Sequence, residues 1–205
     1  MVNRPKKQGT EFERRVADHA AARGLAWDRA PLRGSRDLLD IEGCLPMGWL
    51  VGCKSLSRGV PIAKRLSEAM TELPGKLENA AQIVGRERAA EVIPVQVVQQ
   101  TGKNIGQSFT VTELRYLNRS AAVLLTGCFV GYPDVGDDSL SQRITDGIGR
   151  ATELYDVLNS LPPRFPWAVM ARRGYSTSHH YAITTLDSFL ELVIVRAKWS
   201  GHEHD

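Results

Sequence analysis

The chain has 205 residues, 42% of them hydrophobic, and a formal net charge of +3, which fits one globular domain or one domain with an elaboration. No apolar run reaches the roughly 18 residues of a membrane span and none follows the basic N-terminus, so we expect neither a membrane segment nor a signal peptide. Three cysteines without metal-ligand spacing predict reduced thiols and a cytoplasmic location, and so small a net charge does not by itself indicate a nucleic-acid partner.

The first half of the chain begins with an amphipathic helix over residues 9–23, in which Phe12 and Val16 share one face. Glu13 borders this apolar face, so we expect its carboxylate to point toward the sheet rather than into water. Short apolar runs then predict buried strands, and Pro74 breaks or kinks a long helix. The further elements are strands over 25–29, 37–43 and 49–55, the long helix over 61–84, a hairpin of strands over 92–99 and 108–111, and a short helix over 112–117.

The second half of the chain repeats this pattern. Coincidence between two ordinary segments is the alternative, but shared Pro, Gly and Thr positions favour a duplicated strand–helix–hairpin–helix unit. The predicted elements are strands over 121–130, 165–171 and 180–184, and helices over 139–158 and 185–197. Three pairs share one offset of 72 residues: 93–98 with 165–170, 109–114 with 181–186, and Gly102 with Gly174.

The duplication divides the chain into units over residues 1–118 and 119–205, the second packed on the first or extending its sheet. Leu125-Thr126-Gly127-Cys128 echoes Leu50-Val51-Gly52-Cys53 at a slightly different offset, which places Phe129 where the first unit has Lys54. The second unit also lacks counterparts of the first helix and of the strand that carries Asp40. We therefore expect at most one catalytic centre in the chain.

Asp40 and Lys54 lie on two short apolar runs that predict neighbouring buried strands. A buried carboxylate and a buried ammonium need a partner or a metal. A carboxylate that binds a divalent cation, beside a lysine that steadies a nucleophilic water or a phosphate, is a minimal set for metal-assisted phosphodiester hydrolysis. The alternative is a lysine that ends a strand and extends into solvent.

Cationic side chains gather around these two positions, as phosphate binding requires. The alternative is an ordinary solvated face. The cations are Arg29, Arg33 and Arg36 before Asp40, and Arg58, Lys64 and Arg65 after Lys54.

Three segments carry a specific pattern in order and spacing: Gly9-Thr10-Glu11-Phe12-Glu13-Arg14, then Gly34-Ser35-Arg36-Asp37-Leu38-Leu39-Asp40-Ile41-Glu42-Gly43, then Val51-Gly52-Cys53-Lys54-Ser55. Together they resemble Holliday junction resolvases of the archaeal type and, more closely, their bacteriophage-encoded relatives in the PD-(D/E)xK nuclease superfamily. The resemblance implies an α/β fold with a restriction-endonuclease-like mixed sheet flanked by helices, and a nuclease-like core in the first unit. It also implies an endonuclease that uses Mg²⁺ or Mn²⁺ on branched or duplex DNA. It suggests a homodimer, although a duplicated unit could replace the second subunit.

By the same resemblance, Glu13, Asp40 and Lys54 are the catalytic residues. Glu13 and Asp40 would bind the metal together with the backbone carbonyl of Cys53, and Lys54 would position or activate water. Contacts to DNA would come from Arg14, Arg33, Ser35, Arg36 and Arg58.

The sequence departs from the family pattern at position 52, where glycine replaces the glutamate of the E-x-K motif. Losing this ligand removes charge from a site that binds Mg²⁺ through few carboxylates. Three explanations stay open: another acid fills the space, the chain is an inactive DNA-binding or protein-interaction relative, or the position was altered to remove activity. The candidate acids are Glu13, Asp37, Glu42, Glu68 and Glu72, the last two on the helix that follows.

Overall fold

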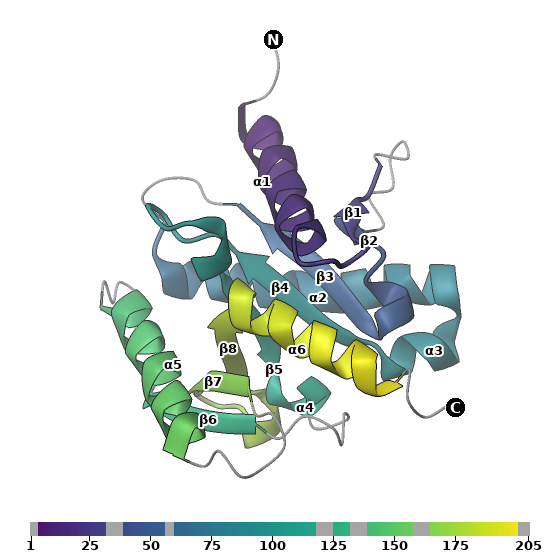
Figure 1. Cartoon of the computed structure of the whole chain (residues 1–205). Coiled ribbons are helices and arrows are strands. Elements are labelled where there is room, and N and C mark those ends of the chain that lie inside the picture. The colour runs from purple at the N-terminus through teal and green to yellow at the C-terminus, as the bar shows by residue number, and fades with distance from the viewer. Residues whose placement is uncertain are drawn as a thin grey trace.

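The structure is a computed structural model that describes residues 4–31, 39–55, 60–117, 125–131, 139–157 and 165–200. As predicted, the chain is a mixed α/β protein in which helices flank a mixed sheet (Figure 1). The helices are α1 (Arg4–Ala21), α2 (Ile62–Val84), α3 (Arg86–Glu91), α4 (Leu114–Leu117), α5 (Leu140–Val157) and α6 (Leu186–Ser200). The strands are β1 (Asp28–Arg29), β2 (Ile41–Glu42), β3 (Trp49–Lys54), β4 (Ile93–Val98), β5 (Phe109–Glu113), β6 (Leu125–Gly131), β7 (Phe165–Met170) and β8 (Tyr181–Thr185).

The main sheet has six strands in the order β3-β4-β5-β8-β7-β6. β3 runs parallel to β4, and β6 runs parallel to β7, whereas the inner pairs are antiparallel. β1 and β2 form a separate two-stranded antiparallel ribbon, which contacts β3 at the edge of the sheet. This ribbon is shorter than the predicted strands over 25–29 and 37–43.

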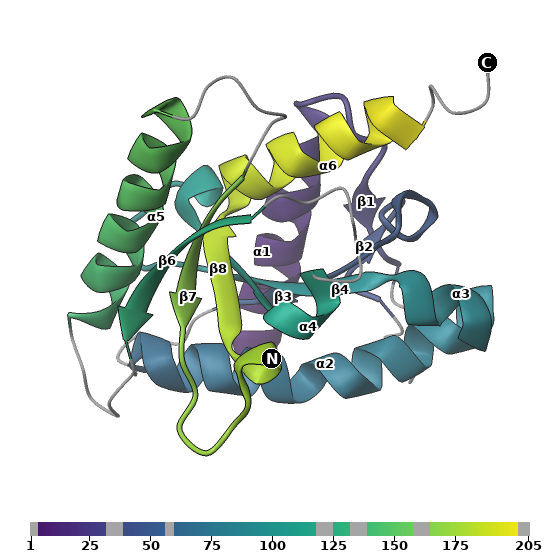
Figure 2. The same ribbon diagram turned by 90° about the horizontal axis from the view of Figure 1, so that it is seen from below.

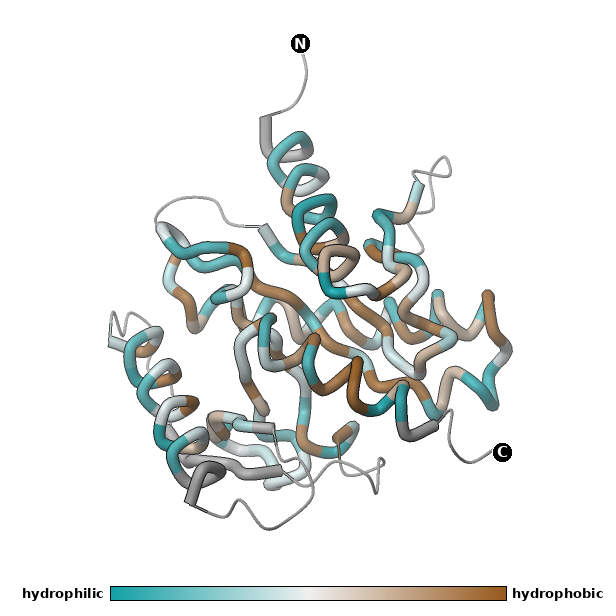
Figure 3. Tube along the Cα trace, viewed as in Figure 1, coloured by the Kyte–Doolittle hydropathy of each residue, from teal (hydrophilic) through white to brown (hydrophobic). Residues whose placement is uncertain are grey.

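Alternate side chains of each strand face opposite sides of the sheet, and helices bury both sides. On one side, Trp49 and Val51 of β3 pack in a cluster with α1 and α6. On the other side, Val98 of β4 and Phe109 of β5 pack against α2 and α5. Figure 2 shows α2 and α6 on opposite sides of the strands, and in Figure 3 hydrophobic colours concentrate along the central strands and on α6.

The two units meet in the middle of the sheet with a symmetric register. Val111 of β5 lies opposite Ile183 of β8, and these residues are 72 positions apart. Val111 also pairs with Gln96, while Ile183 pairs with Ala168, again 72 positions later. The strand pairing therefore repeats at the spacing read from the sequence, about a pseudo-twofold axis between Val111 and Ile183.

Two details of the sequence prediction were wrong: a break at Pro74 and the counterpart of Lys54. α2 continues through Pro74, although proline removes one backbone donor, because buried residues hold the helix to the core on both sides of it. The echo of Lys54 is also misplaced: Lys54 pairs with Val98, and the equivalent partner, Met170, pairs with Gly131 rather than Phe129. The echo is one residue out from the start of β6, where Leu125 pairs with Phe165 as Trp49 pairs with Ile93, and the register shift between Phe129 and Gly131 adds a second residue.

We predict that Phe189→Ala lowers the free energy of unfolding by about 3–5 kcal/mol, measured by urea denaturation. Phe189 is fully buried, and its ring lies edge-on to Trp49 with the centroids 4.9 Å apart. Ile83→Ala is the matched control, because Ile83 is 47% exposed on α2 and should cost no more than about 0.5 kcal/mol. Equal effects of the two substitutions would contradict the assignment of Phe189 to the core.

Candidate functional site

The candidate site lies at the end of the edge strand β3. Gly48 and Lys54 direct their carbonyls inward, since they accept hydrogen bonds from Ile93 N and Gln99 N. Residues alternate along a strand, so the backbone groups of Cys53 face the open edge instead. There Asp40 accepts the Cys53 N–H through Oδ2 at 2.6 Å. The acid of the predicted second strand, which directly precedes β2, therefore binds the backbone of the predicted third strand, β3.

The same oxygen of Asp40 also binds Lys76 of α2, whose Nζ lies 2.6 Å away. Both side chains are well covered, at 14% exposed for Asp40 and 17% for Lys76. A covered carboxylate needs a compensating charge, and here an ammonium supplies it. Lys76 is not among the residues predicted from the sequence; its one signal is the four-residue spacing from Glu72 along α2.

Glu13 reaches the site from α1. Its Oε2 accepts a hydrogen bond from Nε of Arg29 at 3.0 Å, and only 22% of the glutamate side chain is exposed. The end of β3 is close by: a Cβ built on Gly9 would lie 4.0 Å from Oε1 of Glu13 and 3.9 Å from Oγ of Ser55. As predicted, Glu13 points toward the sheet rather than into water.

The charges of Asp40, Lys76 and Glu13 all affect the pKa of the Cys53 thiol. Burial raises its pKa well above the usual 9.0, the charge of Asp40 raises it further, Lys76 lowers it, and Glu13 raises it. The two carboxylates and the ammonium therefore act on one atom. Cys44, which lies nearby in the core, has its pKa raised to about 11, mainly by burial.

Lys54 points to the opposite side of β3 from Cys53, because adjacent residues of a strand face opposite ways. Its ammonium forms an ion pair with the carboxylate of Glu72 on α2. Glu68, one turn earlier, pairs instead with the exposed Lys64. Of the acids proposed to replace the missing glutamate, Glu72 is thus brought to Lys54, and Glu42 lies in β2 opposite Asp28.

The remaining predicted residues divide into two groups. Arg14 is exposed on α1, on the outer side of the same helix that carries Glu13. Arg29, which was predicted as part of a phosphate-binding cluster, is paired with Glu13. The residues that lie outside the described part of the chain are Arg33, Ser35, Arg36, Asp37 and Arg58.

The donor atoms suit a hard divalent cation. Across the described ranges, no three His, Cys, Asp or Glu side chains form a ready-made metal cage. Mg²⁺ does not require one, because it is usually bound through one or two carboxylates and keeps several waters. Asp40, Glu13 and the edge carbonyl of Cys53 provide oxygen donors of that kind, and Lys76 already holds a positive charge beside Asp40.

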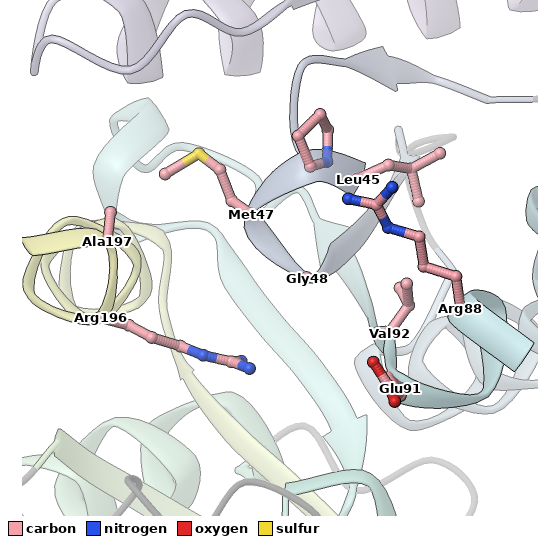
Figure 4. A pocket seen from close by; sticks show the side chains of 9 residues that line it. Leu45, Met47, Gly48, Arg88, Glu91, Val92, Arg196 and Ala197 are labelled. Atoms are coloured by element: carbon pink, nitrogen blue, oxygen red, sulfur yellow. The ribbon is translucent and has the colours of Figure 1, made fainter. Parts of the chain in front are cut away.

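Two hollows lie near β3. One of about 250 Å³ is lined by α1 and by the loop after β4, beside Lys54, whose carbonyl bonds Gln99 N. The other, of about 400 Å³, lies at the opposite end of β3, where Arg88 and Arg196 approach it from different helices (Figure 4). Burial lowers the pKa of Arg196, which lies over the ring of Trp49. Because the larger hollow lies at the Gly48 end of β3, it is not part of the site at Lys54.

Comparison of the chain with protein-family models, with curated proteins and with solved structures gave no match. Among the helices in the described ranges, none combines the length and the apolar character needed to span a bilayer.

We predict that Lys76→Met lowers the free energy of unfolding by about 1–3 kcal/mol, because it leaves the covered carboxylate of Asp40 without its charged partner. Urea denaturation in the presence of EDTA would measure this change. Lys64→Met is the control: Lys64 is 64% exposed in its pair with Glu68, so its loss should cost about 0.5 kcal/mol or less. A Lys76 variant as stable as this control would refute the structural role of the pair.

Proposed function

We propose that the chain is a divalent-metal-dependent endonuclease that hydrolyses phosphodiester bonds in branched or duplex DNA. Its fold would be restriction-endonuclease-like and similar to that of Holliday junction resolvases. The observation that carries the proposal is the arrangement at the end of β3: the carboxylates of Asp40 and Glu13 both act on Cys53, while Asp40 and Lys54 pair with Lys76 and Glu72, one turn apart on α2. Lys54 points to the side of β3 opposite the thiol of Cys53, and Asp40 at the open edge contacts groups from both sides.

Each residue has a role that follows from its contacts. Asp40 and Glu13 would hold Mg²⁺ or Mn²⁺ through carboxylate oxygens, with the Cys53 carbonyl as a third donor. When bound, the metal would polarise the phosphate and lower the pKa of a water. Lys54 would stabilise the charge that develops on the phosphate. Glu72 orients the ammonium of Lys54 through its ion pair.

DNA would lie across the end of β3, with its phosphates near the exposed Arg14. By the resemblance, further contacts would come from Arg33, Ser35, Arg36 and Arg58, which lie outside the described residues. The second unit has glycine at the position of Lys54, so one chain would cut one strand. Paired cuts at a junction would then require a homodimer. A cytoplasmic location agrees with the free thiols of Cys44 and Cys53.

The direct test is cleavage of labelled four-way junctions and linear duplexes with Mg²⁺ or Mn²⁺. We expect the native chain to cut at least one substrate, and Asp40→Asn and Lys54→Ala to lose activity by about 10²-fold or more. Lys64→Ala, a change at an exposed lysine, should cut normally. The enzyme proposal fails if the native chain yields no product with either metal.

Glu72 and Glu68 provide a matched pair on one helix. We predict that Glu72→Ala abolishes cleavage, because Lys54 loses the carboxylate that holds it, whereas Glu68→Ala leaves cleavage unchanged. The same cleavage assay measures both variants. If both cut like the native chain, Glu72 has no part in the reaction.

A catalytically inactive DNA-binding relative is the second candidate. Two observations favour it: Asp40, Glu13 and Glu72 are each paired with a cation of the protein itself, and position 52 carries no acid. Such a binder would hold DNA without cutting it. A plot of the logarithm of its association constant against the logarithm of the salt concentration would fall with a slope of about 0.9 for each phosphate contact. Affinity measured from low to high salt tests this. No binding to DNA even at low salt would leave a protein-interaction role.

A further inference from the structure

The space above Gly52 is filled by a side chain from the neighbouring strand. Gly52 of β3 pairs with Gln96 of β4. A Cβ built on Gly52 would lie 2.5 Å from Oε1, 2.7 Å from Cδ and 2.8 Å from Nε2 of Gln96. Carbon atoms do not approach polar atoms so closely, so any side chain at position 52 requires Gln96 to move. The amide of Gln96 therefore occupies the place where a side chain of residue 52 would begin.

The amide of Gln96 is buried without hydrogen bonds. The residue is 0% exposed, and neither Oε1 nor Nε2 has a partner among the described residues. Buried polar groups are nearly always satisfied, because leaving one unpaired sacrifices its interactions with water. A glutamine with both amide atoms unpaired thus needs an explanation beyond packing.

The fold does not require a polar residue at this position. In the second unit, Ala168 occupies the equivalent place: it pairs with Ile183 as Gln96 pairs with Val111. Ala168 faces an apolar cluster and is fully buried. The position of Gln96 is thus filled by a small apolar side chain in the second unit, where the proposed catalytic residues have no counterpart.

The amide lies on the side of the sheet where the ion pairs form. Gly52 and Lys54 are two residues apart on β3, so a side chain at 52 would share the face of Lys54. That face is covered by α2, which also supplies Glu72 to Lys54 and Lys76 to Asp40. The group that fills the space above Gly52 therefore lies on the same face of β3 as Lys54.

We propose that the amide oxygen of Gln96 supplies the polar ligand that position 52 lacks. It would bind, directly or through a coordinated water, the divalent cation held by Asp40. This inference rests on the proposed function and goes beyond it by assigning a ligand from β4, with Gly52 leaving room for it. A neutral amide oxygen is an accepted ligand for hard cations but contributes less charge than a carboxylate.

The test uses the full chain and Mn²⁺, with binding followed by isothermal titration and thermal unfolding followed with Mn²⁺ or with EDTA. We expect Gln96→Leu to weaken Mn²⁺ binding at least tenfold while the melting temperature in EDTA stays the same or rises. Gln96→Glu should melt lower than the native chain in EDTA, because it buries a carboxylate, and Mn²⁺ should raise its melting temperature more than that of the native chain.

Gln100→Leu is the matched control. Gln100 is also a buried glutamine, but its amide donates to Gln107 O and accepts from Ser141 Oγ. We expect this variant to melt lower and to bind Mn²⁺ like the native chain. That result would separate loss of a buried amide from loss of a metal ligand.

The outcomes distinguish this inference from the proposed function. If the native chain binds Mn²⁺ and cuts DNA, but Gln96→Leu binds Mn²⁺ within twofold of it, the role of Gln96 is refuted and the nuclease proposal stands. The same holds if Mn²⁺ stabilises Gln96→Glu no more than the native chain. If the native chain neither binds Mn²⁺ nor cuts DNA, both proposals fail together.

Discussion

The contact between the carboxylate of Asp40 and the backbone N–H of Cys53 is the constraint on which the site depends. An edge strand presents unpaired backbone groups, and β3 uses one of them to hold the β1–β2 ribbon against the sheet. Once Asp40 is fixed there, its charge must be compensated, and Lys76 of α2 does so at 2.6 Å. The carboxylate of Asp40 thus joins the edge strand β3, the β1–β2 ribbon and helix α2.

The charges around this contact balance as three ion pairs. Asp40 pairs with Lys76, Glu13 with Arg29, and Glu72 with Lys54. Under the proposed function, binding of metal and DNA is an exchange of partners. A divalent cation would replace Lys76 and Arg29 at the two carboxylates, and the displaced cations would become available to phosphates. The desolvation of each charged group is already compensated in the free protein, so the exchange exposes no unpaired buried charge.

The sequence predicted the elements that carry the site because their signals are local. The apolar runs ending near Asp40 and Lys54 and the apolar face next to Glu13 follow from strand and helix periodicity. The pairing of Lys76 with Asp40 was not predictable, since it depends on how a long helix lies over the sheet. Gln96 was missed for a related reason: its contact with Gly52 follows from the register of two parallel strands joined through α2 and α3. The true counterpart of Lys54 was missed in the same way, because it depends on the pairing of β6 with β7 and on the register shift within β6.

The internal repeat provides a comparison that a single domain does not offer. Both units form the same strand pairs at the same spacing, so residues that differ at equivalent positions are not dictated by the sheet. Lys54 corresponds to Gly131, and Gln96 corresponds to Ala168. Both differences place a polar group in the first unit and a small residue in the second, and both lie in the β3–β4 pair. The sheet therefore accommodates small residues at both positions, and the polar groups at the end of β3 are the ones to which the proposed function gives a role.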